Sequence, residues 1–268
     1  MLRRLSYRDL PAVLRVASSA FIEEARRPEV IGPGFLDALS RKPELQIGAF
    51  EEGKLVGFLI GDEGEDWALV NWIAVSPTYQ HRGVGSLLLT EYEQAVKKRG
   101  KSRVRLGTPF SKGFYENMGY TCVNVERVLW KKIVGQEGEP RGEFSADLAK
   151  LLNLLEDFEL DSVRCAFNPG CIIVGKEELG VALAMENRWS RDQVDVVFSK
   201  YQTPEAHFTL LSEVEARARE RGAYSLTERF EETELDLAKK LGWSDENHAL
   251  CWSTYYMEKT LRSALHYH

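Results

Sequence analysis

Apolar residues follow two different periods in the middle of the N-terminal half of the chain. A nearly continuous apolar run from Ala68 to Val75, interrupted by Asn71 alone, is typical of a strand that is buried on both faces. After a Ser-Pro turn, apolar residues recur at the spacing of one helix face: Val84, Leu87, Leu88, Tyr92, Ala95 and Val96. Three basic residues follow at 97–99, where cations favour a helix C-terminus. The pattern therefore predicts a buried strand, a turn and an amphipathic helix as one unit.

Shorter apolar runs predict the other elements of this half. Expected strands lie at 2–7, 45–50, 54–61, 102–107 and 121–133, and expected helices at 9–21, 35–40 and 112–118. Glu51-Glu52-Gly53 is a hairpin signal between two of the strands, and the prolines and glycines of 23–34 predict a loop. The strand at 121–133 is expected to close this part of the sheet. The order βααβββαβαβ is that of an α/β (α+β) protein.

The second half repeats features of the first. Three features recur 123 residues further on: Gly57 as Gly180, Gly119 as Gly242, and Leu87-Leu88 as Leu210-Leu211. Duplication is the economical explanation, and chance matching of glycines in two α/β domains is the alternative. Segment 135–142 carries three glycines and a proline without an apolar anchor, which is typical of a linker. We therefore expect one domain at 1–134 and a second at 143–268.

Composition narrows the class of protein. Of the 268 residues, 44% are apolar and 28% are charged, which is ordinary for a soluble globular protein. We expect a cytoplasmic protein without a membrane segment, because no apolar run of the necessary length occurs. The four cysteines are scattered, so free thiols are expected and no metal site; a disulfide between Cys165 and Cys171 is the alternative.

Charge is divided unevenly between the two halves. Residues 1–134 carry 20 Lys and Arg against 16 Asp and Glu, whereas residues 135–268 carry 15 against 25. Only the first half therefore suits a polyanionic ligand, unless the two halves merely have different solvated surfaces. Nucleic acid is not expected as a partner, since the chain is acidic overall and shows no basic stripe.

The turn between the buried strand and the amphipathic helix has the chemistry of an anion site. It reads Gln80-His81-Arg82-Gly83-Val84-Gly85. Its two glycines allow the backbone to approach a bulky anion, and the N–H groups of the first helical turn point at such a ligand. Arg82 adds a positive charge that can pair with phosphate. Glycine at such a turn can also allow close packing, so the glycines alone do not identify an anion site. The longer sequence around them is more specific.

The string from Ala74 to Gly85 is Ala-Val-x-Pro-x-Tyr-Gln-x-Arg-Gly-x-Gly. Followed by an apolar helix, it resembles the acyl-CoA-binding motif of the GNAT superfamily of N-acyltransferases. It lacks the spacing of the dinucleotide fingerprint and the Gly-Lys-Ser/Thr ending of a nucleotide P-loop. The resemblance implies the GNAT fold, a mixed central sheet flanked by helices, here in two tandem copies.

The resemblance also implies a co-substrate and its contacts. Acetyl-CoA would meet the strand at Ile73, Ala74 and Val75, with the N–H of Val75 on the thioester carbonyl. Its pyrophosphate would be held by the loop, whose members are Gln80, His81, Arg82, Gly83, Val84 and Gly85, with Ser86 next in line.

A second resemblance concerns the segment Gly113 to Tyr120. It is similar to the superfamily's Phe-Tyr-x-x-x-Gly-Phe ending, whose tyrosine lies near the CoA sulfur. A phenol is protonated at neutral pH, so Tyr115 is the candidate acid for the departing thiolate. The alternative is a packed aromatic residue on a short helix.

The general base is not identified by the sequence. Family members that use a carboxylate or histidine on the motif strand would need it near Leu69 or Asn71, and neither residue accepts a proton. Asn71 remains a candidate for orienting a water or the substrate amine. Glu65 and Asp66 precede the strand and could act through a water chain, or they only solvate a loop.

The second copy has lost the residues that carry this chemistry. At the offset of 123, Arg82 becomes Glu205, Gly83 becomes Ala206, Gly85 becomes Phe208 and Tyr115 becomes Ala238. We therefore expect an N-acetyltransferase whose first half acts on a primary amine of a small molecule or a peptide. The alternatives are a CoA-binding sensor without turnover and a pure interaction protein. The acceptor is not specified, and a homodimer is left open.

Overall fold

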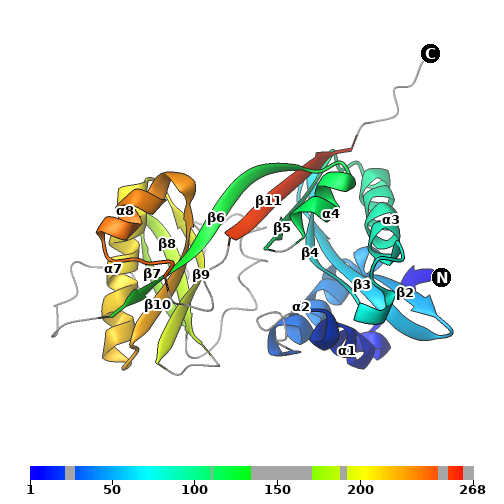
Figure 1. Cartoon of the computed structure of the whole chain (residues 1–268), viewed down its shortest axis with the longest axis horizontal. Coiled ribbons are helices and arrows are strands. Elements are labelled where there is room, and N and C mark those ends of the chain that lie inside the picture. Colours follow the sequence, from blue (N-terminus) through cyan, green and yellow to red (C-terminus); the bar gives the residue numbers. More distant parts are fainter. Residues whose placement is uncertain (22–27, 110, 134–170, 188–191, 247–252, 262–268) are drawn as a thin grey trace, which may run out of the picture. The chain divides into compact units, whose positions relative to one another are not determined.

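The computed structural model describes residues 1–21, 28–109, 111–133, 171–187, 192–246 and 253–261 (Figure 1). The chain divides into two compact units, one made of Met1–Asn124 with Tyr255–His268 and the other of Val125–Thr254. The first unit thus ends before the boundary expected at 134, and it includes a segment from the end of the sequence. The linker expected at 135–142 lies outside the described residues.

The first unit is built on a mixed sheet with the strand order β1-β2-β3-β4-β5-β11-β6. Neighbours from β1 to β4 are antiparallel, as are β5 and β11, whereas β4 and β5 are parallel. This confirms the mixed sheet flanked by helices. The strands are β1 Leu2–Arg4, β2 Ile47–Glu51, β3 Lys54–Glu63, β4 Trp67–Val75, β5 Arg103–Thr108, β6 Thr121–Lys132 and β11 Ser253–Thr260.

Helices cover both faces of this sheet (Figure 1). They are α1 Leu10–Ala20, α2 Pro28–Arg41, α3 Val84–Lys98 and α4 Lys112–Asn117. Alternate residues of β3 enter different cores: Phe58 and Ile60 pack with α1 and α2, and Leu59 packs with α3. Because neighbouring residues of a strand point to opposite faces, this alternation buries β3 on both sides, as the sequence predicts for the centre of the sheet.

The helix α2 is longer than expected. The sequence predicts a loop at 23–34, but α2 begins at Pro28 and includes Pro33. A proline inside a helix removes one backbone hydrogen bond. Ile31, Phe35 and Leu39 are all buried in the core under this helix, and burying three such side chains outweighs the lost bond.

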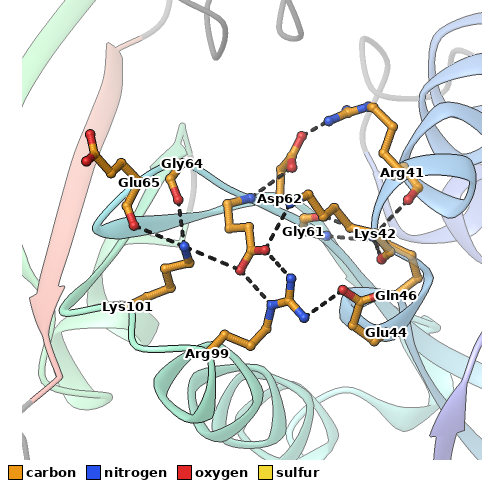
Figure 2. A network of polar contacts seen from close by, with 12 residues as sticks. Arg41, Lys42, Glu44, Gln46, Gly61, Asp62, Gly64, Glu65, Arg99 and Lys101 are labelled. Carbon is orange, nitrogen blue, oxygen red and sulfur yellow. Dashed lines mark hydrogen bonds and ion pairs between the residues drawn. The ribbon is translucent and has the colours of Figure 1, made fainter.

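A polar network connects α2, β3 and the end of α3 on one side of the first unit. Figure 2 shows Lys42, Arg99 and Lys101 converging from different elements. Their common partner is Glu63, whose side chain is 4% exposed and whose carboxylate accepts hydrogen bonds from Lys42 Nζ at 3.0 Å and Arg99 Nε at 2.8 Å. These cations lower the pKa of Glu63 to about 2, with the Arg99 hydrogen bond as the largest cause. The network therefore fixes three elements through one buried charge.

Two strands are exchanged between the halves of the sequence. The strand expected at 121–133 exists as β6, but from Glu126 to Lys132 it pairs with β10, Ser225–Glu231, in the second unit. The strand beside β5 is β11, which pairs with β5 in register from Tyr255–Thr108 to Thr260–Arg103. The expectation that 121–133 closes the first sheet is therefore wrong for most of that strand, because local patterning does not specify which neighbour a strand will have.

In its described residues, the second unit repeats the order of strands and α-helices that runs from β2 to α4 in the first. Its strands follow the order β6-β10-β9-β8-β7, and only β9 and β10 are parallel. The additional elements are β7 Ile172–Lys176, β8 Gly180–Glu186, β9 Gln193–Tyr201, α7 Pro204–Glu220 and α8 Leu235–Lys240.

Details of the backbone repeat as well. The register shift between Ile60 and Gly61 in β3 recurs between Leu183 and Ala184 in β8, which is the offset of 123 seen in the sequence. Gly119 and Gly242 have φ values of 84° and 89°, a left-handed conformation that favours glycine. Each of these glycines ends its short helix in the same conformation.

Candidate active site

The parallel strands β4 and β5 separate halfway along their length. Their pairing runs from Trp67–Arg103 to Val70–Leu106, and β4 then continues to Val75 beside β3 alone. The separation begins at Asn71, which forms a β-bulge: Val70 pairs with Gly61 and Trp72 pairs with Ile60, so Asn71 has no partner residue in β3. Such a bulge bends its strand, and it opens a gap between β4 and β5.

Peptide groups of β4 face this gap. The N–H of Ser76 donates to Val56 O at 2.8 Å, so by antiparallel alternation Ala74 also bonds toward β3, and Ile73 and Val75 direct their peptide groups to the other side. The carbonyl of Val75 is held there by the side-chain amide of Gln80, at 3.0 Å. Ala74 is 3% exposed and packs in the core on the α1 side. Of the three strand residues that the sequence predicts, Ile73 and Val75 thus direct their N–H groups away from β3, and Ala74 does not.

The loop that follows β4 is shaped by two left-handed residues. His81 has φ 59° and Gly83 has φ 81°, and α3 begins directly after Gly83. A side chain at Gly83 would meet no protein atom within 4 Å, whereas one at Gly85 would contact the Phe114 ring at 3.4 Å. The first N–H groups of a helix have no acceptor within the helix, and Gly83 provides no side-chain cap for α3. The loop therefore offers bare backbone and free donors to a ligand.

The side chains of His81 and Arg82 lie on the solvent side of the loop. His81 and Arg82 are exposed, and the Arg82 guanidinium lies 5.4 Å from the ring centroid of Tyr79. Val84, Gly85 and Ser86 are partly buried at the start of α3. The predicted loop residues thus form one continuous surface that ends at the helix N-terminus.

Tyr115 lies in α4 behind this surface. Its ring is 5% exposed and meets Phe114 and Tyr120 edge to face, with ring centroids 5.0 and 5.8 Å apart. Burial raises the pKa of the Tyr115 phenol above its ordinary value, so the group keeps its proton at neutral pH. Because Phe114 also approaches Gly85, α4 and the N-terminus of α3 form two sides of one site.

The acidic residues considered for a base, Glu65 and Asp66, lie away from the gap between β4 and β5, whereas Asn71 lies beside it. Asn71 is exposed at the bulge, next to the gap between the strands. Asp66 binds Arg103 at 2.7 Å, and this hydrogen bond lowers its pKa. From Asp66 to Asn71 the chain advances about 17 Å along the strand. A single water cannot bridge that distance, so neither Asp66 nor Glu65 acts directly at the gap.

The equivalent place in the second unit is filled by side chains. The strands β9 and β10 also separate, after the pair Asp195–Thr227. His207 is completely buried there, stacks on Tyr201 with ring centroids 4.0 Å apart, and hydrogen-bonds Glu234 at 2.9 Å.

The start of α7 is closed in the same way. Thr203 Oγ1 accepts from the N–H of Ala206 at 3.2 Å, so a side chain of the protein caps this helix. Phe208 stacks on Phe230 nearby, with ring centroids 5.6 Å apart. The start of α7 thus has one N–H fewer to offer to a ligand than the start of α3, and an aromatic ring lies where the first unit has Gly85.

No helix of the described residues combines the length and the apolar character needed to cross a membrane.

A family model and curated relatives are similar to part of the chain. Residues 10–120 match the family model described as "Acetyltransferase (GNAT) family". Over 139 residues the chain is 28% identical to serotonin N-acetyltransferase of Mesocricetus auratus, covering 45% of this chain and 67% of that protein. Over 91 residues it is 30% identical to [ribosomal protein bS18]-alanine N-acetyltransferase of Escherichia coli strain K12, covering 32% of this chain and 62% of that protein.

Two solved structures are similar in fold over nearly the whole chain. A putative acetyltransferase from Pyrococcus horikoshii superposes with a TM-score of 0.69 at 15% identity, covering 98% of this chain and 89% of that one. A GCN5-related N-acetyltransferase from Anabaena variabilis gives a TM-score of 0.65 at 12% identity, covering 98% and 73%. These similarities include both units. The match to the GNAT acetyltransferase family thus covers residues 10–120, and the two structures show that the fold is similar over both units.

Proposed function

We propose that the first unit transfers the acetyl group of acetyl-CoA to a primary amine of a small molecule or a peptide. The observation that carries this proposal is one opening that combines free backbone on β4 with an uncapped helix N-terminus on α3. In an acyl transfer, the first can bind a thioester carbonyl and the second a pyrophosphate.

The loop residues fit a CoA pyrophosphate. Phosphate oxygens need closely spaced donors and room against the backbone, and the empty space at Gly83 provides that room. The donors are the N–H groups from His81 to Ser86, and Arg82 adds charge from the solvent side; the N–H of Gln80 already donates to Pro77 O. When bound, acetyl-CoA supplies an activated thioester. The protein then has to position the reactants and supply hydrogen bonds.

The N–H of Val75 is assigned to the carbonyl oxygen of the acetyl group. This oxygen gains negative charge when the amine attacks, and a fixed donor there stabilises the transition state more than the ground state. The Gln80 amide holds the neighbouring carbonyl of Val75 and thus helps to fix the peptide group. Ile73 offers a second N–H on the same side of the strand.

Tyr115 is assigned to the departing sulfur. Burial raises its pKa, so the phenol carries its proton when the reaction starts. We assign it a hydrogen bond to the departing sulfur and proton donation within that bond, with the proton that the attacking amine loses returning to the phenolate. Asn71, at the bulge, is assigned to orienting the acceptor amine. No base is assigned, so the amine has to react in its neutral form, and activity should rise with pH.

The second unit is proposed to be a duplicate that no longer binds the donor. Its repeated elements support a common origin, and the buried aromatic residues at the place of the loop support the loss. A CoA-binding sensor without turnover is the second candidate function. The missing general base favours this second function: Asp66 is paired with Arg103 far from Asn71, and no other carboxylate is assigned to the chemistry.

Two measurements on the full chain test these proposals. Calorimetry with acetyl-CoA should show one binding site per chain, and release of free thiol should accelerate with at least one member of a panel of primary amines. Binding without thiol release would leave the sensor function. The absence of binding would refute both functions.

A further inference from the structure

The wall behind Tyr115 includes residues from β11, the strand that the second half of the sequence contributes to the first unit. Met257 is completely buried in the same core as Tyr115 and Tyr120. Tyr255 lies under Lys112 of α4, whose Nζ is 5.2 Å from the ring centroid. The helix that carries the proposed acid therefore packs against a strand from far along the chain.

One side chain of this strand begins a chain of polar contacts toward Tyr115. Lys259 Nζ donates to Glu93 Oε2 on α3 at 2.8 Å, and the hydroxyl of Tyr120 donates to Glu93 Oε1 at 3.0 Å. Both oxygens of a carboxylate that is only 12% exposed are thereby occupied. The Tyr120 ring then meets the Tyr115 ring at an interplanar angle of 70°.

The second unit contains the same ion pair without the tyrosines. Lys131 on β6 binds Glu215 on α7 at 2.8 Å, and the exposed fractions of the two side chains are 24% and 14%, against 24% and 12% for Lys259 and Glu93. A side chain added at Gly242 would lie 3.7 Å from Lys131 Cε, and one at Gly119 would lie 3.7 Å from Lys259 Cε. The two pairs are therefore similar in distance and burial, although Glu215 lies one position before the residue that the offset of 123 assigns to Glu93.

The two ion pairs differ in the third group that binds the glutamate. The second oxygen of Glu215 accepts from Arg219 at 3.1 Å, where Glu93 accepts from Tyr120. In the positions of Tyr120 and Tyr115 the second unit has Trp243 and Ala238. The lysine–glutamate pair is thus common to both units, and only in the first is it connected to the residue assigned to the chemistry.

We propose that Lys259 is a positioning residue for acyl transfer: through Glu93 and Tyr120 it fixes the ring of Tyr115, so that a strand from the second half of the sequence controls the proposed acid. This inference rests on the proposed function and on Tyr115 as its acid. A misplacement of about 1 Å at a reacting group can lower a rate by up to about 100-fold. Loss of the contacts from Lys259 to Tyr120 should therefore have a measurable effect on kcat.

The experiment compares Lys259→Met with Lys131→Met in the full chain. Both changes keep the apolar stem and leave a glutamate without its lysine, so both should lower the melting temperature by similar amounts. Lys259→Met should lower kcat by about 3- to 10-fold with an unchanged KM for acetyl-CoA, whereas Lys131→Met should leave kcat within about twofold. Lys259→Arg, which can still pair with Glu93, should restore most of the loss.

Two further variants separate positioning from loss of fold. Tyr120→Phe keeps the ring and the ion pair but removes the hydroxyl, and it should reproduce the fall in kcat without the fall in melting temperature. In a Tyr115→Phe background, Lys259→Met should change kcat by less than about 1.5-fold, because the positioned group is already absent.

Three results would overturn the proposal: equal kinetic losses in Lys259→Met and Lys131→Met, full activity in Tyr120→Phe, or an undiminished effect of Lys259→Met in the Tyr115→Phe background. A failure of the proposed function is distinguishable from these, since the wild-type chain would then release no thiol. A failure of the acid assignment is distinguishable too, since Tyr115→Phe alone would be fully active.

Discussion

Replacing Glu63 by glutamine removes the one charge on which three cations converge in the first unit. The pKa of Glu63 falls from 4.5 to about 2 because Arg99 and Lys42 bind its carboxylate, and such a drop corresponds to roughly 3 kcal/mol of stability at neutral pH. The Arg99 side chain is 37% exposed, so water compensates part of its loss. We therefore expect Glu63→Gln to lower the free energy of unfolding by about 2 kcal/mol at pH 7.

The sign of the pH dependence follows from the lowered pKa. Between the unfolded and folded values the unfolded chain binds more protons, so the contribution of Glu63 is complete above about pH 5 and is lost as pH falls from 4.5 toward 2. The difference between wild type and Glu63→Gln should therefore shrink from pH 7 to pH 3. Urea unfolding, measured at several pH values on both proteins, gives this difference directly.

Glu44→Gln is the matched control for this experiment. It removes the same charge from the same Arg99, which Glu44 contacts at 2.8 Å, but the Glu44 side chain is 43% exposed. Exposed pairs contribute little, so we expect a change of less than about 0.5 kcal/mol. Equal effects of the two substitutions, or a Glu63→Gln effect that does not vary with pH, would show that the buried network does not act through charge.

Three further predictions concern the site and the second unit. Gly83→Asp should weaken acetyl-CoA binding by at least about 100-fold, because it adds a side chain and a negative charge to the loop, whereas Gly100→Asp, with a similar φ of 83° and equally open space, should not; calorimetry compares them. Tyr115→Phe should keep that affinity and lower kcat by about 10- to 1000-fold in a thiol-release assay, with a smaller loss at low pH, and an unaltered rate would remove the residue from the mechanism. Burial raises the pKa of Glu228 well above its ordinary value, so its carboxylate form destabilises the fold as pH rises above the unfolded value; Glu228→Gln should therefore stabilise the protein more at pH 8 than at pH 5, and a larger gain at pH 5 in thermal unfolding would contradict this.

The sequence predicts the elements around the proposed site from local signals. Apolar runs and turn residues located β4, the loop and α3, because those signals arise within a few residues of each other. The glycines of the loop were interpretable for the same reason, since the positive φ of Gly83 is a local requirement. The helix around Pro33 was missed because burial of its neighbours, which depends on tertiary packing, overrides the proline signal.

The contacts between distant segments could not be predicted. Lys259 and Glu93 are 166 positions apart, and a lysine at the end of an amphipathic strand is unremarkable by itself. The pairing of β6 with β10 is equally invisible, because the same alternation of residues would suit the edge of either sheet. The sequence therefore predicts which strands exist but not which half of the protein each one completes.

The exchange of β6 and β11 has a consequence for biosynthesis and for evolution. During translation, N-terminal domains generally fold first, but here β5 has no antiparallel neighbour until residues 255–260 have left the ribosome, so the first unit should mature only after the second has been made. The second unit, which we propose to be a degenerate duplicate, would then be indispensable to the first, since deleting it would remove both the strand that pairs with β6 and the source of β11. Such mutual dependence would preserve the second unit without any selection on a second active site.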